Sequence, residues 1–506
     1  MTVRELLDQV FMHVMPSEDI RQLSQWGPAL DVSCQGVTHD SRSVRPGWVF
    51  VGLRGQKADG AEFAPQAIAA GAAAVVSERA AAPGSPVPWI VVADARFTLA
   101  WLAAEFFQHP SRQMRVVGIT GTNGKTTTSY IVSAIFEAAG VRCGLMGTVK
   151  YRIGDREIAA ARTTPEAPEL QAMLREMVDA GSGACAMEVS SHALSLRRAD
   201  GIRFAAGVFT NLTRDHLDFH ADMEGYFAAK RRLFELLPSD APAVVNLDDP
   251  RGSAMAEAAT RTVTYAVNRA ANVTPGPLSF SLEGLQFEVR TPQGSLNVRS
   301  SLVGRPNVYN ILAAVSTTTA LGVPLDAVER GIARLQGVPG RFEQVSSSAD
   351  DISVIVDYAH TDDALRNLLE MARPLADRRL ITVFGAGGDR DRTKRPLMGM
   401  VAARLSDVVV ITSDNPRSED PQRIIDEINL GAQPETRQRD VQVLTVVDRR
   451  DAIYKVVRDA AAGDLVLIAG KGHEKYQEIG GRTLPFDDVA VVREALEARR
   501  QRVRVG

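Results

Sequence analysis

Cysteine is scarce in this chain, and long apolar runs are lacking. Three of the 506 residues are cysteine, and their positions (34, 143 and 185) follow no paired or metal-binding spacing. Such usage is typical of a protein in a reducing compartment. No apolar run approaches the roughly 20 residues that a membrane helix requires. Residues 1–20 contain acids and a proline and lack an apolar core, which argues against a signal peptide. We therefore expect a cytoplasmic protein with no membrane partner.

A large charge of one sign is lacking as well. The formal net charge is −3, so the chain as a whole offers no surface for a polyanion, and nucleic acid is a poor candidate partner. The apolar share of 45% and the charged share of 24% are ordinary for a globular protein. A chain of 506 residues is too long for one hydrophobic core, so about three domains are expected.

The pattern of strands and helices divides the chain into three α/β domains at two joints. The first joint is His109-Pro110-Ser111, because proline disfavours helix in the residue before it. The second is the glycine- and proline-containing segment 337–340. The predicted domains are therefore residues 1–110, 111–339 and 340–506.

The second and third of these domains are predicted to hold different sheets. Buried-strand candidates at 184–189, 207–211 and 242–246 indicate a mostly parallel sheet in the second. Residues 262–303 alternate apolar and polar positions and predict an antiparallel addition. The third repeats strand–helix units, which predicts a doubly wound, Rossmann-like sheet whose ligands sit beyond the carboxyl ends of the strands. Its predicted strands are 353–358, 380–384, 407–412, 441–447 and 464–469, and its predicted helices include 421–430.

Residues 115–128, RVVGITGTNGKTTT, are typical of a loop that holds nucleotide phosphates. A buried strand leads into glycines 121 and 124, which let backbone N–H groups face an anion. Lys125 then adds a point charge, and Thr126 can offer its hydroxyl to Mg²⁺ at the start of a helix. Ile119 stands where the Walker A pattern has its first glycine. The alternative is a glycine-rich surface turn, which the strand–loop–helix context disfavours.

With these segments in order, the chain closely resembles the Mur ligases, ATP-dependent amide-bond-forming enzymes of bacterial peptidoglycan synthesis. It is most similar to the members that add the third residue of the stem peptide. The resemblance implies an N-terminal UDP-sugar domain, a central ATPase-like domain and a Rossmann-like C-terminal domain. The matching signatures are GTNGKTT at 121–127, EVSSHAL at 188–194, NLTRDHLDFH at 211–220, YFAAK at 226–230, NVYN at 307–310, GR at 340–341, DYAHT at 357–361 and GKGHE at 470–474.

By this resemblance, four residues carry the chemistry: Lys125, Glu188, His216 and Lys230. Glu188 would ligate Mg²⁺ together with Thr126 and phosphate oxygens, since oxygen ligands suit this hard cation. His216 would ligate a second metal ion. Lys230 would carry a carbamate formed from CO₂, which requires a neutral amine and therefore a lowered pKa. The alternatives are a solvated strand-end glutamate, a structural histidine and a surface lysine that lies along an amphipathic helix face.

Three substrates are implied, and the enzyme is expected to act as a monomer. ATP would be held by the phosphate loop and by residues around the second joint, with Arg341 reaching the phosphates only when the domains close. Packing roles are the alternative for Tyr358 and His360. The ATP residues are Gly121, Thr122, Asn123, Gly124, Lys125, Thr126, Thr127, Asn307, Arg341, Asp357, Tyr358 and His360.

The second substrate implied is UDP-N-acetylmuramoyl-L-alanyl-D-glutamate, gripped by the first two domains. Arg162 stands where some relatives have asparagine, and Leu196 where some have glutamine, so two family contacts differ here. Polar turn residues such as Ser41 and Thr163 are also ordinary capping residues. The expected contacts are His39, Ser41, Gln56, Lys57, Ala58, Thr163, Thr164, Ser190 and Arg198.

The third substrate implied is meso-2,6-diaminopimelate. It differs from lysine by a second carboxylate, which a planar guanidinium recognises bidentately. Arg417 and Arg390 are the expected clamps, and Glu474 can hold the distal ammonium; a solvated arginine in a proline turn is the alternative. The expected site is Arg390, Asp414, Asn415, Pro416, Arg417, Gly470 and Glu474.

Other activities on the same fold are alternatives. A lysine-adding ligase, a D-Ala-D-Ala-adding ligase and a folylpolyglutamate synthetase are sister functions; the N-terminal block argues against the folate enzymes and the DNPR segment against lysine. A phosphate-loop switch protein, which binds nucleotide and a partner without ligating anything, would leave Glu188, His216 and Lys230 without purpose.

Overall fold

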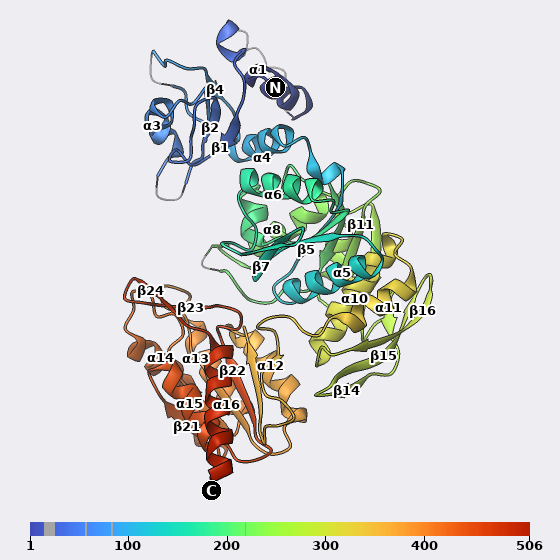
Figure 1. Cartoon of the computed structure of the whole chain (residues 1–506), viewed down its shortest axis with the longest axis vertical. Helices are drawn as coiled ribbons and strands as arrows, with labels where there is room; N and C mark the ends of the chain where they lie inside the picture. Colours follow the sequence, from blue (N-terminus) through green and yellow to red (C-terminus); the bar gives the residue numbers. More distant parts are fainter. Residues whose placement is uncertain (15–25, 56–57, 82–83, 218, 506) are drawn as a thin grey trace.

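The computed structural model describes residues 1–14, 26–55, 58–81, 84–217 and 219–505 and shows three α/β domains that follow one another along the chain (Figure 1). Each domain has its own main sheet. This three-domain α/β architecture is the one that the sequence predicted. Within the described ranges, no helix combines the length and the apolar character needed to cross a membrane.

The first domain is a parallel four-stranded sheet with helices on both faces, in the order β1-β2-β3-β4. Alternate residues of β2 point to opposite faces: Val49 and Val51 join the core under α1 and α4, whereas Phe50 joins the core under α3. The elements are α1 (Val3–Val14), β1 (Gly36–Thr38), β2 (Trp48–Gly52), α3 (Ala64–Ala69), β3 (Ala74–Ser77), β4 (Trp89–Val91) and α4 (Ala95–Phe106).

The central sheet has eight strands in the order β12-β11-β10-β5-β9-β6-β7-β8. Its first six strands in this order are parallel and only β7 and β8 are antiparallel, which confirms the mostly parallel prediction. The strands are β5 (Arg115–Thr120), β6 (Cys143–Met146), β7 (Lys150–Ile153), β8 (Arg156–Ala159), β9 (Ala184–Glu188), β10 (Phe204–Phe209), β11 (Pro242–Asn246) and β12 (Arg261–Tyr265).

The prediction of an antiparallel addition over 262–303 was wrong at its start. β12 pairs in parallel with β11, with Val244 opposite Val263. It is an edge strand whose residues are mostly half-exposed, so its side chains alternate in polarity as those of an antiparallel strand do. The rest of the segment is antiparallel as predicted: β13 (Thr274–Pro275), β14 (Ser279–Ser281), β15 (Gly284–Thr291) and β16 (Gly294–Ser300).

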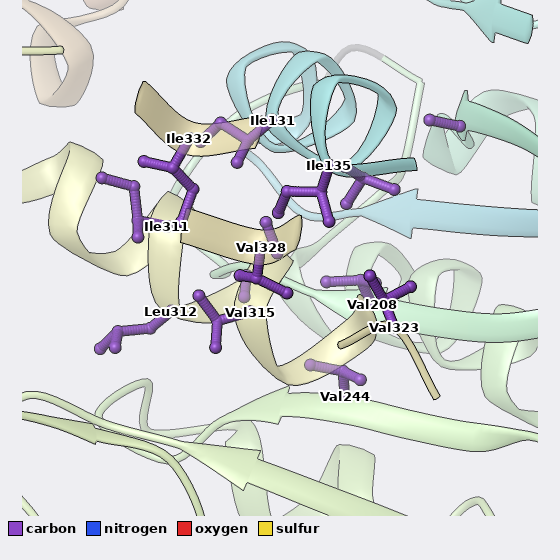
Figure 2. Close-up of a cluster of buried hydrophobic side chains, with 14 of the residues drawn as sticks. Ile131, Ile135, Val208, Val244, Ile311, Leu312, Val315, Val323, Val328 and Ile332 are labelled. Carbon is purple, nitrogen blue, oxygen red and sulfur yellow. The ribbon is translucent and has the colours of Figure 1, made fainter. Parts of the chain in front are cut away.

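Three helices cover one face of the central sheet: α5 (Lys125–Ala138), α10 (Arg305–Ala320) and α11 (Leu325–Arg334). Figure 2 shows Ile131 and Ile135 of α5 facing apolar side chains of α10 and α11 above strand residues Val208 and Val244. This packing fixes the start of α5, which follows the phosphate loop. The opposite face carries α6 (Ala167–Asp179), α7 (Ser191–Ser195), α8 (Met223–Glu235) and α9 (Gly252–Ala256).

The third domain is a six-stranded sheet in the order β17-β18-β22-β19-β20-β21. All neighbours except β17–β18 are parallel, and separate apolar cores lie on the two faces. The doubly wound prediction therefore holds. The strands are β17 (Glu343–Gln344), β18 (Ser353–Asp357), β19 (Leu380–Phe384), β20 (Val408–Ile411), β21 (Gln442–Thr445) and β22 (Leu465–Ala469).

One helix of this domain is longer than predicted, and one hairpin was not predicted. α14 runs from Pro421 to Thr436 with Pro434 inside it, although proline disfavours a helix interior. The hairpin of β23 (Tyr476–Ile479) and β24 (Arg482–Pro485) follows the GKGHE segment. The other helices are α12 (Asp362–Ala372), α13 (Lys394–Leu405), α15 (Arg449–Asp459) and α16 (Asp488–Val505).

Candidate active site in the cleft between the central and C-terminal domains

The phosphate loop joins β5 to α5 and needs glycine at two positions. Gly121 and Gly124 have φ values of 147° and 86°, a region that favours glycine. A Cβ at Gly121 would also collide with the Thr210 hydroxyl, and one at Gly124 with the Asn310 side chain. The Asn211 side chain accepts a hydrogen bond from the Asn123 N–H at 2.9 Å. The neighbours of the loop therefore fix its backbone conformation.

Two lysines meet at one backbone oxygen of this loop. Lys125 Nζ donates to the carbonyl oxygens of Gly121 and Thr122, both at 2.8 Å. Lys230 Nζ, from α8, donates to the same Gly121 oxygen at 2.8 Å. Burial lowers the pKa of Lys125, and burial together with the charge of Lys125 lowers the pKa of Lys230 well below its ordinary value. The structure therefore gives Lys230 the neutral-amine tendency that carbamate formation requires.

Lys230 is 1% exposed and lies against an aromatic ring. Its Nζ is 4.3 Å from the ring centroid of Tyr226, one helical turn earlier. The Tyr226 hydroxyl hydrogen-bonds with Thr122 Oγ1 at 3.2 Å. A lysine that lies along a solvated helix face would be exposed, so this alternative reading of Lys230 was wrong.

Glu188 ends β9 and is 1% exposed. Its two carboxylate oxygens accept hydrogen bonds from Thr148, one from the backbone N–H at 2.9 Å and one from the hydroxyl at 3.0 Å. Its negative charge acts on Lys125, so the two side chains belong to one electrostatic site. The alternative of a solvated strand-end glutamate was wrong.

His216 has a left-handed backbone, with φ of 55°. The carboxylate of Asp215 accepts the backbone N–H of His216 at 2.9 Å and lies 3.3 Å from its Nε2. Burial lowers the pKa of His216 to about 4, against the opposing effect of Asp215. The imidazole is therefore neutral near pH 7 and can offer a lone pair. Among the described residues, no three His, Cys, Asp or Glu side chains converge as a ready metal cluster.

A cleft of about 720 Å³ lies between the central and C-terminal domains. Polar contacts hold its two sides together: Asn123 Nδ2 donates to Asp363 at 3.2 Å, and Arg214 donates to Thr393 at 2.9 Å. The predicted site residues that line it are Thr163, His216, Tyr358, His360, Arg390, Asp414, Asn415, Arg417, Gly470 and Glu474. These residues are up to 311 positions apart in the sequence (474 minus 163).

Arg341 connects the C-terminal domain to the phosphate loop. Its Nη2 donates to Thr126 Oγ1 at 3.2 Å, and its guanidinium lies 4.7 Å from the ring centroid of Tyr358. The sequence predicted that Arg341 reaches the phosphate site only on domain closure. In this structure the contact is already made.

The remaining ATP candidates shape their own turns. The Asp357 carboxylate accepts the N–H groups of Phe342 and Ala359, at 2.7 and 2.8 Å, and burial raises its pKa. His360 Nδ1 lies 2.9 Å from the Tyr358 carbonyl oxygen. Asn307 donates to the Val303 carbonyl at 2.8 Å. These contacts commit the Asp357 carboxylate and the Asn307 amide to the protein's own backbone.

The diaminopimelate candidates gather at the carboxyl ends of β19, β20 and β22. Arg417 has φ of 52°, its Nη1 donates to the Gly388 carbonyl at 2.8 Å, and its Nε is 2.9 Å from a carboxylate oxygen of Glu478. Fully buried Lys471 donates to Asn415 Oδ1 at 3.0 Å and to Glu474 at 3.1 Å. Glu474 is therefore already paired with a cation of the protein.

The candidates for the muramyl peptide form a connected group in the central domain. Thr164 Oγ1 donates to the Glu188 carbonyl at 3.0 Å and accepts the Ser190 N–H at 3.1 Å. Arg198 is 2.6 Å from Glu166, and Thr163 hydrogen-bonds with Thr148 at 3.1 Å. The Ser190 hydroxyl caps α7, the ordinary role of such a residue.

The first-domain candidates lie elsewhere. Ser41 is 9% exposed and donates to Gln66 at 3.0 Å, and His39 has a buried Nδ1 without a hydrogen-bond partner in the described structure. The Ala58 carbonyl accepts the Gly55 N–H at 2.9 Å. None of these three lines the cleft. Gln56 and Lys57 lie outside the described residues.

The sequence prediction missed several charged side chains that line the cleft, among them Arg214, Asp215 and Lys394. Burial lowers the pKa of Lys394, and its Nζ donates to the His360 carbonyl at 2.9 Å. Each missed residue is adjacent to or within a few positions of a predicted one, as Asp215 is to His216. Proximity to a motif at a strand end was the available signal.

Comparison with known proteins gives matches along nearly the whole chain. Three family models match: "Mur ligase family, catalytic domain" over residues 33–107, "Mur ligase middle domain" over 119–318 and "Mur ligase, glutamate ligase domain" over 340–472.

Individual relatives cover similar lengths. A Gloeobacter violaceus protein named UDP-N-acetylmuramoyl-L-alanyl-D-glutamate–2,6-diaminopimelate ligase is 49% identical over 93% of this chain and 96% of its own. A Solibacter usitatus protein of the same name is 47% identical over 91% and 93%. A solved structure of a protein with that name is 36% identical, with a TM-score of 0.67 over 93% of this chain and 96% of its own.

Proposed function

This chain belongs to the Mur ligase family, and we propose that it is an ATP-dependent ligase. It joins meso-2,6-diaminopimelate to the D-glutamate of UDP-N-acetylmuramoyl-L-alanyl-D-glutamate and forms ADP and phosphate, in peptidoglycan precursor synthesis. The relatives at 49% and 47% identity carry the name of this activity. The observation that carries the proposal is a cleft lined by cationic side chains of both domains, among them Arg214 and Arg417.

The proposed reaction proceeds in two steps. A carboxylate is a poor electrophile, so its oxygen first attacks the γ-phosphorus of ATP and ADP leaves, which gives an acyl phosphate. The neutral amine of diaminopimelate then attacks the acyl carbon, phosphate leaves with the C–O bond pair, and the amine's proton is lost to solvent. The protein's contribution is to position the reactants and to neutralise charge.

Lys125 and Arg341 are placed for charge neutralisation. Among the described residues, Lys125 donates to two carbonyl oxygens, so a phosphate can replace these neutral acceptors at a gain in charge pairing. Arg341 approaches Thr126 from the other domain, at the position where a transferred phosphoryl group would lie. The two cations therefore come from opposite sides of the same site.

The donor set fits Mg²⁺. The Thr126 hydroxyl and Glu188 carboxylate are hard oxygen donors, and the neutral His216 imidazole would ligate a second metal ion. Mg²⁺ held there would neutralise phosphate charge. Lys230 suits the site only after modification: its neutral amine attacks CO₂, loses a proton and becomes an anionic carbamate. The positive charge of Lys125 then balances the buried negative carbamate, whereas it would repel a protonated Lys230.

The first domain and its joint to the second are proposed to hold the uridine diphosphate part of the substrate. His39, Ser41 and Ala58 lie on that domain, while Thr163, Thr164, Ser190 and Arg198 lie beside Glu188. A long substrate would connect the two groups and present its terminal carboxylate in the cleft. The cytoplasm, where ATP and the nucleotide sugar are available, is the proposed location.

An amino-acid panel tests the proposal. The protein is incubated with ATP, Mg²⁺, UDP-N-acetylmuramoyl-L-alanyl-D-glutamate and either meso-diaminopimelate, L-lysine, D-Ala-D-Ala or glutamate; phosphate and product mass are measured. Phosphate release with a product of the mass expected for one added diaminopimelate supports the proposal. Equal use of L-lysine, or ADP formation without a new amide for any amine, contradicts it. Slow hydrolysis that depends on neither the peptide nor the amine would instead indicate a nucleotide switch.

A further inference from the structure

Glu478 is a charged residue near the amino-acid end of the cleft that the proposed mechanism leaves unused. It lies on β23, the strand that leads away from the GKGHE segment. Its Oε2 is 2.9 Å from Nε of Arg417, and it is absent from the residues that line the cleft, whereas Arg417 lines it. Glu478 therefore contacts the arginine from outside the cavity.

Arg417 has several contacts besides this carboxylate. The Arg417 Nη1 donates to the Gly388 carbonyl at 2.8 Å. The backbone N–H of Arg417 donates to the Glu478 carbonyl at 2.9 Å, and the Gly480 N–H donates to the Arg417 carbonyl at 2.8 Å. These backbone contacts would remain if the side chain at 478 were neutral. The Glu478 carboxylate therefore adds charge to the site rather than an anchor.

Asp389 is another carboxylate near Arg417, and it is committed elsewhere. Asp389 accepts hydrogen bonds from the Ser418 hydroxyl at 2.7 Å and from the Ser418 N–H at 3.2 Å. Arg417 and Glu478 are 25% and 35% exposed, so their attraction is partly screened by water. The pair is thus close enough to reduce the field of Arg417 in the cleft and too exposed to be a main support of the fold.

From this geometry we infer that Glu478 is a specificity-determining counter-charge that weakens the attraction of Arg417 for the substrate's distal carboxylate. The inference rests on the proposed function. A guanidinium that already faces one carboxylate attracts a second carboxylate less strongly. The side chain at position 478 therefore sets the affinity for the dicarboxylate substrate and the preference for it over lysine, without touching either.

Neutralising Glu478 tests the inference. In Glu478→Gln the KM for meso-diaminopimelate should fall about three- to tenfold, because one screened unit charge is removed. The KM for ATP and the KM for the muramyl dipeptide should stay unchanged. Glu494→Gln is the matched control, since it removes the partner of Arg450 in the same domain, far from Arg417 in sequence, and should leave all three KM values unchanged.

Two further measurements complete the test. In an Arg417→Ala background, Glu478→Gln should no longer lower the KM for diaminopimelate, because its effect acts through that arginine. Use of L-lysine relative to diaminopimelate should fall in Glu478→Gln. A KM for diaminopimelate that is unchanged or raised, with the melting temperature preserved, would overturn the inference and would show that the carboxylate orients the arginine. Failure of the unmutated protein to ligate diaminopimelate at all would contradict the proposed function itself.

Discussion

The phosphate loop and the amino-acid end of the cleft hold their positive charges differently. At the phosphate loop, Lys125 and Lys230 donate to backbone carbonyls, and both have lowered pKa values. At the amino-acid end, Arg417 faces Glu478 and Lys471 faces Glu474. Neutral acceptors leave a lysine ready for an incoming anion, whereas a carboxylate partner has to be matched by the ligand. The difference suits a polyanionic nucleotide on one side and a zwitterionic amino acid on the other.

The largest effect is expected on the lysine side, at Lys230. Lys230→Arg keeps a positive charge but cannot form a carbamate, so kcat should fall about 10²- to 10³-fold, as for loss of one preorganised charge-stabilising group. Steady-state kinetics with and without added bicarbonate measure it. The kcat of Lys230→Ala should fall by a similar factor, and bicarbonate should restore the activity of neither variant. Near-normal turnover of Lys230→Arg would show that no carbamate is needed.

The next effect is expected on the carboxylate-paired side, at Arg417. Removal of a clamp that bonds a desolvated carboxylate costs about 2–4 kcal/mol, so Arg417→Ala should raise the KM for diaminopimelate at least about 30-fold. The KM for ATP should change little, because Arg417 lines the cleft, whereas none of the described residues of the phosphate loop does. Substrate-saturation curves for the two ligands separate these effects. An equal rise in both KM values would mean that the whole cleft was disturbed.

A smaller effect is expected where the two sides meet, at Arg341. Arg341→Ala removes the hydrogen bond to Thr126 and the stacking on Tyr358. A charged hydrogen bond of this kind contributes about 1.5 kcal/mol, so the KM for ATP should rise about tenfold with the KM for diaminopimelate unchanged. Arg330→Ala, which removes an exposed ion pair with Asp326, is the control. An unchanged KM for ATP in Arg341→Ala would indicate that the ATP phosphates bind away from Thr126.

The smallest effect concerns the stability of the C-terminal side at low pH. Burial and the charge of Arg341 lower the pKa of His473 to about 3, below the ordinary value of about 6.5. The folded protein therefore keeps His473 neutral, and its contribution to stability is complete above about pH 6.5 and is lost as the pH falls toward 3. In His473→Gln the melting temperature should fall less steeply between about pH 6.5 and about pH 3 than in the unmutated protein. The difference should be at most that expected from the binding of one proton. An identical pH profile would show that His473 titrates normally.

Much of the fold was predictable because it depends on local patterns. Buried apolar runs placed β9, β19 and β22 within a residue, and the residues after the strands of the third domain marked the edge of the sheet that borders the cleft. The same logic failed at β12, because an edge strand of a parallel sheet alternates in polarity as an antiparallel strand does. Local patterns report which faces of a strand are buried and not which neighbour it pairs with.

The sequence by itself determined the phosphate loop, the three-domain α/β order and the identities of the charged residues at the strand ends. Only the tertiary structure decided which of those charges face one another. That Lys230 and Lys125 share the Gly121 oxygen, that Arg341 reaches Thr126 and that Glu478 faces Arg417 follows from contacts between segments up to 215 residues apart. The strength of a charge depends on its burial and its partner, and both are set only when the chain has folded.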